Sequence, residues 1–296
     1  MSRDQLQALD VMLRGGELDL GGDLATQRGV FEAMMSHVPL SADIETAQST
    51  LGTIPVVDIT IDGLETEGVI LYFHGGAYAI GSAMLAAGLA SDIARLAGSR
   101  VVSVDYRLAP ERPYPAAIED AIRAYRGLLE SGVEASSVVF AGESAGAGVV
   151  AATLVALTAT DLPQPAAAYL ISPWVDLTLT GASIANNAPV DPTLTPEGLR
   201  RRSLDYLAGQ DPTNGAISPI FANLTGLPPM LIQVGGHEIL LDDATRLAAR
   251  AAADGVAVTL EVTSGAPHVF PAFAAMLDEG EDALNNAARF IRHHVR

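Results

Sequence analysis

A serine between two glycines is the first group in this chain whose setting favours chemistry. Ser144 is the central residue of Gly142-Glu143-Ser144-Ala145-Gly146, which fits the pattern G-x-S-x-G. An apolar stretch at 138–141 predicts a buried strand before it, and an alanine-rich stretch at 149–160 predicts a buried helix after it. So sharp a turn strains the backbone of the serine and exposes its hydroxyl at a helix N-terminus, where developing negative charge is favoured. We therefore predict that Ser144 is a nucleophile.

A serine hydroxyl reacts only when a base takes its proton, and that base is most often histidine. Of the six histidines in the chain, His268 fits this role, because it lies in a glycine-proline turn after a predicted strand at 256–262. Reacting groups of an open α/β sheet come from loops at the carboxyl ends of strands. We expect His74 to brace the glycine loop beside it and His37 to cap a helix. His293 and His294 are expected to face solvent.

The base in turn needs a carboxylate that orients its ring. The strand predicted at 229–234 leads into a segment with three candidates, namely Glu238, Asp242 and Asp243. Glu238 is favoured because it comes first after the strand, whereas either aspartate would serve as the N-cap of the next helix. His237 beside Glu238 invites a zinc interpretation, but the motif H-E-x-x-H requires histidine where Leu241 stands. We therefore predict no metal site here.

Acyl transfer also requires donors for a tetrahedral oxyanion. The loop after the strand predicted at 68–73 contains Gly75 and Gly76, whose backbone N–H groups are unhindered. The N–H group of Ala145 directly follows the nucleophile. We predict that these three groups form the oxyanion hole.

Composition excludes several other kinds of chemistry. The chain has 296 residues, 49% of them hydrophobic, and a net charge of -18. Such an acidic chain, whose only basic cluster is at 200–202, is not expected to bind nucleic acid. It has no cysteine, which excludes disulfides and thiolate catalysis, and no lysine, which excludes Schiff bases and Ser-Lys dyads. No apolar stretch is long enough for a membrane span, and no secretory signal is recognisable, so we expect a cytoplasmic protein.

Strands and helices alternate along most of the chain, which predicts an α/β fold with a mostly parallel sheet. Two amphipathic helices at 5–13 and 24–37 come first, and Asp62-Gly63 predicts a hairpin. The alternation is broken at 177–219, which predicts an insertion with one helix at 196–207. The other predicted strands lie at 55–61, 101–104 and 166–171, and the other predicted helices at 83–97, 116–130, 242–253 and 281–294.

Several motifs together resemble the hormone-sensitive-lipase-like (family IV) esterases of the α/β-hydrolase superfamily. The matching stretches follow one another in order over roughly residues 55–296. They are His74-Gly75-Gly76-Ala77-Tyr78 with Gly81-Ser82, Asp105-Tyr106-Arg107-Leu108-Ala109-Pro110-Glu111 with Pro113-Tyr114-Pro115-Ala116-Ala117, Gly142-Glu143-Ser144-Ala145-Gly146, Ser172-Pro173-Trp174-Val175-Asp176-Leu177, and Pro267-His268-Val269-Phe270.

The resemblance implies an eight-stranded, mostly parallel sheet with a helical cap. Residues 1–50 would supply cap helices, and residues 51–296 a catalytic domain with a cap insertion around 178–218. It implies hydrolysis of short- to medium-chain carboxylic esters without a cofactor, with a small-molecule ester as the partner. It also implies that Ser144 is the nucleophile, His268 the base, and Gly75, Gly76 and Ala145 the oxyanion donors. A homodimer is a further expectation from the family.

The chain departs from the family pattern at three positions. The family usually has glycine where Ala77 stands and aspartate where Glu143 stands. The triad acid is usually an aspartate about 30 residues before the histidine. Here Glu238 lies 30 residues before His268, and Asp242 matches the second aspartate of the same family motif. Glutamate can replace aspartate in this role.

Two rival functions use the same fold. A ligand-binding receptor is one, but relatives of that kind lack the histidine that His268 supplies here. An amidase or a lactonase on the same triad is the other, and only a panel of substrates separates it from an esterase. Residues expected to line the substrate pocket of the cap are Phe31, Met34, Met35 and Leu204.

Overall fold

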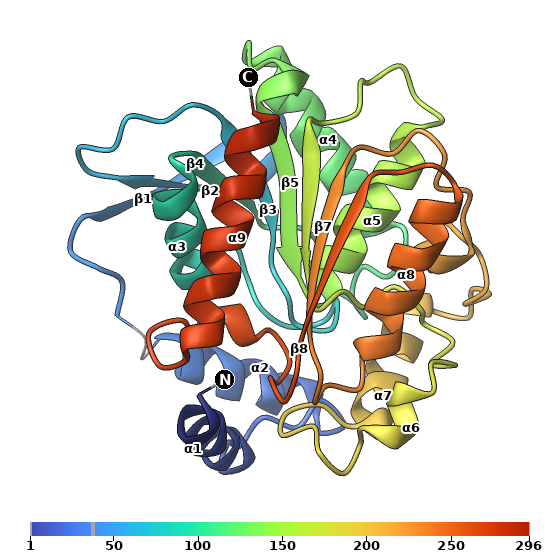
Figure 1. Cartoon of the computed structure of the whole chain (residues 1–296). Helices are drawn as coiled ribbons and strands as arrows, with labels where there is room; N and C mark the ends of the chain where they lie inside the picture. The colour runs from blue at the N-terminus through green and yellow to red at the C-terminus, as the bar shows by residue number, and fades with distance from the viewer. Residues whose placement is uncertain (1, 37–38, 296) are drawn as a thin grey trace.

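A single twisted sheet runs through the molecule (Figure 1). The computed structural model describes residues 2–36 and 39–295, and within them the sheet has eight strands in the order β1-β2-β4-β3-β5-β6-β7-β8. The strands are β1 (Ile44–Leu51), β2 (Ile54–Ile61), β3 (Val69–Phe73), β4 (Arg100–Val104), β5 (Val138–Glu143), β6 (Ala167–Ile171), β7 (Met230–Gly235) and β8 (Val258–Thr263). The predicted α/β-hydrolase fold with an eight-stranded, mostly parallel sheet is therefore confirmed.

Helices cover both faces of this sheet. β1 pairs antiparallel with β2, β2 pairs antiparallel with β4, and the remaining neighbours pair parallel. In Figure 1, α3 (Ala87–Ala97) and α9 (Asp278–His294) lie in front of the sheet. α4 (Ala116–Glu130), α5 (Ala145–Leu157) and α8 (Leu241–Ala253) lie behind it. This arrangement leaves the ends of the strands open for a site.

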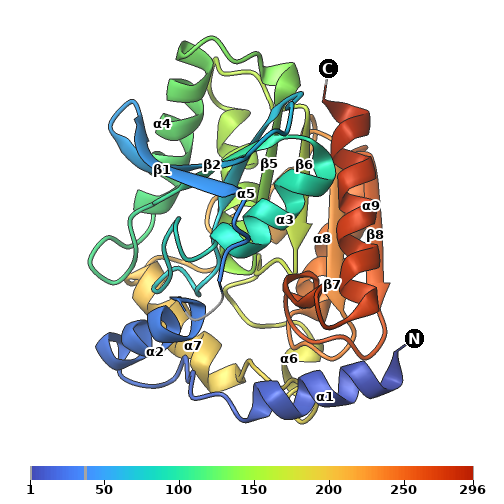
Figure 2. The same cartoon turned by 90° about the vertical axis from the view of Figure 1, so that its left-hand side faces the viewer.

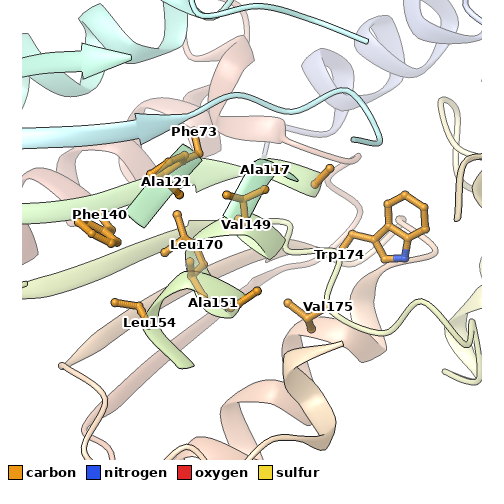
Figure 3. Packing of buried hydrophobic residues seen from close by; sticks show 14 of the residues in the cluster. Phe73, Ala117, Ala121, Phe140, Val149, Ala151, Leu154, Leu170, Trp174 and Val175 are labelled. Carbon is orange, nitrogen blue, oxygen red and sulfur yellow. The ribbon is translucent and has the colours of Figure 1, made fainter. Parts of the chain in front are cut away.

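The sequence of β3 shows why the sheet is buried on both faces. Its five residues are all apolar, and alternate side chains point to opposite faces. Leu71 and Phe73 belong to the core cluster under α4, α5 and α8, whereas Ile70 and Tyr72 belong to the cluster under α3 and α9. Phe73 and Phe140 meet edge to face at 5.8 Å, and they pack in the cluster that contains Val149 (Figure 3). β3 and β5 therefore form the rigid centre of the sheet.

The helices outside the alternating pattern gather at one end of the sheet. They are α1 (Arg3–Arg14), α2 (Leu24–Ser36), α6 (Ser183–Asn186) and α7 (Pro196–Leu207). Figures 1 and 2 both place them at the lower end of the molecule, where the loops that follow β3 and β7 also lie. The segments that the sequence predicts as cap therefore lie next to one another. Their division into domains at residue 50 stays a prediction.

Some predicted elements need correction. β1 was not expected, and it forms the hairpin with β2 across the two-residue turn Gly52-Thr53. A hairpin at Asp62-Gly63 is wrong, because β2 pairs with β1 and β4 rather than with the next strand, β3. α5 begins at Ala145, directly after the nucleophile, instead of at residue 149. The predicted helix 24–37 ends at Ser36 in α2, and His37, with its predicted capping role, lies outside the described residues.

Candidate active site

Ser144 lies in a strained turn between β5 and α5. Its backbone angles are φ 56° and ψ -123°, which an L-residue adopts only under constraint. The turn is fixed on both sides, because Ser144 N–H donates to Ile171 O at 2.9 Å and Ser144 O accepts from Trp174 N–H at 3.1 Å. The sequence prediction of a tight strand–turn–helix around Ser144 is thus what the structure shows.

Two glycines make this turn possible. A Cβ atom on Gly142 would lie 2.6 Å from Phe73 O, and one on Gly146 would lie 2.0 Å from the same oxygen. Real Cβ atoms do not approach backbone atoms so closely, so only glycine lets β5 and α5 approach β3 at these positions. The two glycines of the pattern G-x-S-x-G are therefore required here by close packing.

His268 and Glu238 form a hydrogen-bonded pair at the same edge of the sheet. Glu238 follows β7, His268 follows β8, and His268 Nδ1 lies 2.6 Å from Glu238 Oε2. The other oxygen, Glu238 Oε1, accepts the N–H of Gly235 at 2.6 Å and the hydroxyl of Ser172 at 2.7 Å. The Glu238 side chain is fully buried, and only a tenth of the His268 side chain is exposed. The pair is therefore rigid and largely shielded from water.

The environment of His268 favours its protonated form. Burial lowers the pKa of His268, but the charge of Glu238 and the hydrogen bond to it outweigh this effect, so the pKa lies above its ordinary value. The more distant charges of Asp191 and Glu143 act in the same direction. An imidazole so placed stabilises the positive charge that it acquires when it accepts a proton.

The competing carboxylates have other partners. Asp242 Oδ2 accepts the N–H of Ser183 at 3.0 Å at the start of α6. Asp243 is buried, and its Oδ2 accepts the N–H groups of Val175 and Asp176, both at 2.8 Å. Of the three carboxylates that the sequence offers, Glu238 is the one that contacts His268.

Ser144 and His268 are brought to the same edge without a direct hydrogen bond between their side chains. Within the described residues, neither the Ser144 hydroxyl nor His268 Nε2 has a hydrogen-bond partner. The end of β6 links them instead, because Ile171 holds the backbone of Ser144 while Ser172 Oγ accepts the N–H of Val269 at 3.0 Å. Hydrogen bonds between catalytic groups are often long before substrate binds and tighten in the complex.

The glycine loop after β3 departs from the prediction at one residue. Gly75 N–H donates to Glu143 Oε1 at 2.6 Å, so this amide already has a strong acceptor. Gly75 therefore does not fit the role of oxyanion donor that the sequence suggested. Gly76 and Ala77 fit it better, because no acceptor is found for their N–H groups, or for that of Ala145, among residues 2–36 and 39–295.

The loop owes its shape to a series of unusual backbone angles. Gly76 has φ 114°, and a Cβ atom there would lie 2.1 Å from Ile80 O. Ala77 and Tyr78 follow with φ 52° and 61°, a region that residues other than glycine rarely adopt. The family glycine that Ala77 replaces would carry no such strain. The strain at Ala77 indicates that the surrounding contacts hold this loop firmly.

Glu143 is the main contact of the loop with the nucleophile turn. Besides Gly75 N–H, it accepts the hydroxyl of Tyr72 from β3 in a short hydrogen bond. Desolvation raises the pKa of Glu143 to about 7, although both hydrogen bonds and the nearby His268 act in the opposite direction. The sequence signalled Glu143 as a departure from the family but gave no sign of these partners.

His74 and His237 do not join the site. His74 is buried, stacks on Tyr106 at 4.3 Å, and donates from Nδ1 to Gly75 O at 2.7 Å. Burial lowers the pKa of His74 to about 4, so it is neutral and braces the loop, as predicted. The side chain of His237 is exposed. No cluster of three or more metal-binding side chains is present in the described part of the chain.

Helix α2 is attached to the same loop through one arginine. Arg28 donates to Ala79 O at 2.9 Å, to Ala109 O at 3.1 Å and to both carboxylate oxygens of Glu111 at 2.7 Å.

Of the residues predicted to line the substrate pocket, Phe31 packs against the core, whereas Met34 and Leu204 are 45% and 65% exposed. None of the helices within residues 2–36 and 39–295 has the length and apolar character to cross a membrane.

Comparison with known proteins agrees with this geometry. The family described as "alpha/beta hydrolase fold" matches residues 70–272, a span that contains Ser144, Glu238 and His268. The chain belongs to the α/β-hydrolase family. A crystal structure of an esterase from the bacterial hormone-sensitive lipase family superposes on this α/β-hydrolase with a TM-score of 0.95, at 41% identity and over 99% of both chains. The resemblance drawn from the motifs is therefore confirmed.

Several relatives of this α/β-hydrolase carry names that describe ester hydrolysis. An acetyl-hydrolase of Streptomyces hygroscopicus is 45% identical over 223 residues, which are 75% of each chain. An esterase of Acinetobacter venetianus is 33% identical over 264 residues, 89% of this chain and 87% of the relative. The crystal structure of EstE5 soaked with p-nitrophenyl butyrate has a TM-score of 0.93 and 39% identity, over 98% of both chains.

Proposed function

We propose that this α/β-hydrolase is a serine carboxylesterase that cleaves short- to medium-chain carboxylic esters. The observation that carries the proposal is the 2.6 Å contact between His268 Nδ1 and Glu238 Oε2, at the sheet edge where a strained turn presents Ser144. A carboxylate bound at Nδ1 keeps a proton on that atom and leaves Nε2 to act as a base. The relatives named esterase or acetyl-hydrolase support the same reaction class.

The first half of the reaction forms an acyl-enzyme. Ser144 Oγ attacks the ester carbonyl while neutral His268 takes its proton at Nε2. Glu238 stabilises the resulting imidazolium, since its fully buried carboxylate keeps its charge close to the ring. The protonated His268 then gives its proton to the leaving alcohol oxygen as the C–O bond breaks.

The negative charge on the carbonyl oxygen needs donors that are in place before the reaction. We assign the backbone N–H groups of Gly76, Ala77 and Ala145 as the oxyanion donors. Ala77 thus replaces Gly75 in the set predicted from the sequence. Each well-placed donor of this kind lowers an acyl-transfer barrier by about 3 kcal/mol. The N-terminus of α5, which begins at Ala145, adds its positive dipole end at the same place.

The second half of the reaction repeats the proton transfers with water. His268 takes a proton from a water molecule that attacks the acyl carbon. The tetrahedral intermediate then collapses, the bond to Ser144 Oγ breaks, and His268 gives its proton to Ser144 Oγ as the acid is released. Every step in this scheme uses side chains and backbone N–H groups of this chain, together with water. The partner is a small-molecule ester, and the homodimer expected from the family stays a prediction.

Two observations bear on the choice among related functions. The relative with 45% identity is named an acetyl-hydrolase, which favours a short acyl group here as well. The intact His268–Glu238 pair argues against a ligand-binding receptor, which has no use for a rigid base and acid. We therefore rank ester hydrolysis above binding without turnover.

A chain-length series of p-nitrophenyl esters tests the proposal. We expect kcat/KM to be highest between the acetate and the hexanoate and to fall for the laurate and the palmitate. Ser144→Ala should abolish turnover of all of them at unchanged circular dichroism. Ester hydrolysis that survives in Ser144→Ala, or a wild-type protein that cleaves none of the series, would contradict the assignment. Parallel assays with anilides and lactones would reveal an amidase or a lactonase.

A further inference from the structure

We propose that Ser172 is a positioning residue for this reaction: its hydroxyl orients the carboxylate of Glu238 and fixes the backbone beside His268. The inference rests on the proposed esterase function and extends it by one residue that is not part of the predicted triad. Ser172 directly follows β6, is fully buried, and has a backbone φ of 47°. A non-glycine residue in this region of φ is strained, which indicates that its surroundings hold it in place.

The hydroxyl of Ser172 makes two hydrogen bonds with different parts of the site. It donates to Glu238 Oε1 at 2.7 Å and accepts the N–H of Val269 at 3.0 Å. A hydroxyl has one donor and two acceptor lone pairs, so both bonds form at the same time. One atom therefore joins the loop after β7, which carries the acid, to the loop after β8, which carries the base.

The first bond determines which carboxylate oxygen faces the imidazole. Glu238 Oε1 receives two donors, Ser172 Oγ–H and Gly235 N–H at 2.6 Å, and Oε2 is left to His268 Nδ1. Rotation of the carboxylate would break both bonds in a fully buried place, where unpaired polar groups are costly. The hydroxyl thus restricts the carboxylate to the orientation that meets the ring.

The second bond acts on the base. Val269, the residue after His268, has a left-handed backbone with φ 54°, and Ser172 is the acceptor for its N–H group. Ser172 is itself anchored, because its N–H donates to Gln233 O at 2.7 Å, and its neighbour Ile171 holds the N–H of Ser144 at 2.9 Å. The positions of nucleophile, acid and base therefore all depend on the end of β6.

The test replaces the hydroxyl and follows how the reaction responds. Ser172→Ala removes both bonds, and Ser172→Gly removes them while also relieving the strained φ, so that at least one folded variant is available. Ser103→Ala is the matched control, since Ser103 is equally buried in β4 and its hydroxyl has no partner among the described residues. Kinetics with p-nitrophenyl butyrate are measured across pH, together with the low-field proton NMR signal of His268 Nδ1–H.

A positioning role predicts a selective defect. In both Ser172 variants kcat should fall roughly 10- to 100-fold while KM changes less than about twofold, because alignment rather than binding is lost. The acid limb of the rate should move to lower pH and the Nδ1–H signal upfield, as the contact between Glu238 and His268 loosens. Ser103→Ala should keep wild-type values in every measurement.

Three outcomes distinguish a failure of the inference from a failure of the function on which it rests. If wild-type protein hydrolyses the ester and both Ser172 variants keep its kcat, pH profile and Nδ1–H signal, the positioning role is wrong while the esterase stands. If Ser172→Gly is folded and loses only stability, with unchanged kinetics, the hydroxyl is structural and the inference is again overturned. A wild-type protein without esterase activity would instead refute the proposed function.

Discussion

Gly75 and Glu143 are joined by a hydrogen bond of 2.6 Å between the amide of the glycine and the carboxylate of the glutamate. The bond connects the loop after β3 with the residue that precedes Ser144. It therefore couples the position of the prospective oxyanion donors Gly76 and Ala77 to the position of the nucleophile. Tyr72 completes this unit, because its hydroxyl donates to the other oxygen of the same carboxylate.

Replacement of Glu143 should loosen the loop. Glu143→Ala leaves Gly75 N–H and the Tyr72 hydroxyl without their acceptor, at a cost of roughly 1–3 kcal/mol of stability for each buried group. We expect kcat to fall about tenfold or more, because the oxyanion donors shift. Glu143→Gln keeps an acceptor oxygen and should lose less. Equal activity in wild type, Ala and Gln variants, measured with p-nitrophenyl butyrate, would show that the bond does not matter for turnover.

The assignment of the acid predicts opposite results for two neighbouring carboxylates. Glu238→Gln should reduce kcat by roughly 10³ to 10⁴, because an amide that donates to Nδ1 stabilises the wrong tautomer of His268. Asp242→Asn should change kcat by less than about threefold, since Asp242 caps α6 instead. Circular dichroism of both variants controls for folding. A reversed pattern, with the larger loss in Asp242→Asn, would overturn the choice of Glu238.

A buried carboxyl group makes stability depend on pH. Desolvation raises the pKa of Asp243 from 3.8 to about 8 in the folded protein. Between these values the folded state holds a proton that the unfolded state has lost, so the free energy of unfolding falls as pH rises, by at most about 1.4 kcal/mol per pH unit. The contribution is complete below pH 3.8 and lost as pH rises through about 8.

Asp243→Asn removes this titration while it keeps an oxygen for Val175 and Asp176. Urea unfolding at pH 5 and pH 8 should show that the wild-type protein loses more stability between these two pH values than the variant does. Parallel stability curves across this range would contradict the raised pKa of Asp243.

Arg28 should hold α2 against the rest of the molecule. Arg28→Ala removes donors from the carbonyl groups of Ala79 and Ala109 as well as the ion pair with Glu111, and we expect a loss of about 1–2 kcal/mol. Arg95→Ala is the control, because Arg95 makes a comparably exposed pair with Asp43, which should contribute less than about 1 kcal/mol. Hydrogen exchange over residues 24–36 should rise in Arg28→Ala alone. Unchanged exchange there would refute the anchoring role.

Local signals in the sequence predict two of the helices at both ends. The predicted bounds of α4 and α7 agree with the structure at both ends. A proline-rich loop precedes α4. Thr195 is the N-cap of α7, because its side chain accepts the N–H of Gly198 at 3.1 Å, and Pro196 follows at the first helical position. Such signals are contained within a few residues, so they can be recognised without knowledge of the fold.

β1 could not be predicted in the same way. Its six central residues are all exposed, so it has no apolar alternation to mark it as a strand. It exists because β2 offers a full row of backbone partners from Ile44 to Leu51. The turn at Asp62-Gly63 is real, but the strand order that decides its partners is set by long-range pairing.

In the site, too, features with local sequence signals can be predicted, whereas features that depend on long-range contacts cannot. Ser144, Glu238 and His268 can be predicted as site residues because each follows a predicted strand, and the carboxyl ends of parallel strands meet at one edge. Gly75 does not fit the predicted donor role, because its amide is bound by Glu143, 68 residues further along the chain. Ser172 belongs to a family stretch, but the sequence assigns it no role, because its partners, Glu238 and Val269, are 66 and 97 residues away. Contacts at such separations leave no local pattern.

Mass spectrometry of the protein during turnover tests the central claim most directly. Acid quenching within the first turnover of p-nitrophenyl butyrate should trap one butyryl group per chain, and peptide mapping should place it on Ser144. The adduct should be absent from Ser144→Ala and should accumulate more slowly in His268→Ala. A protein that releases p-nitrophenol without a covalent adduct, or that carries the adduct on another residue, would contradict nucleophilic catalysis by Ser144.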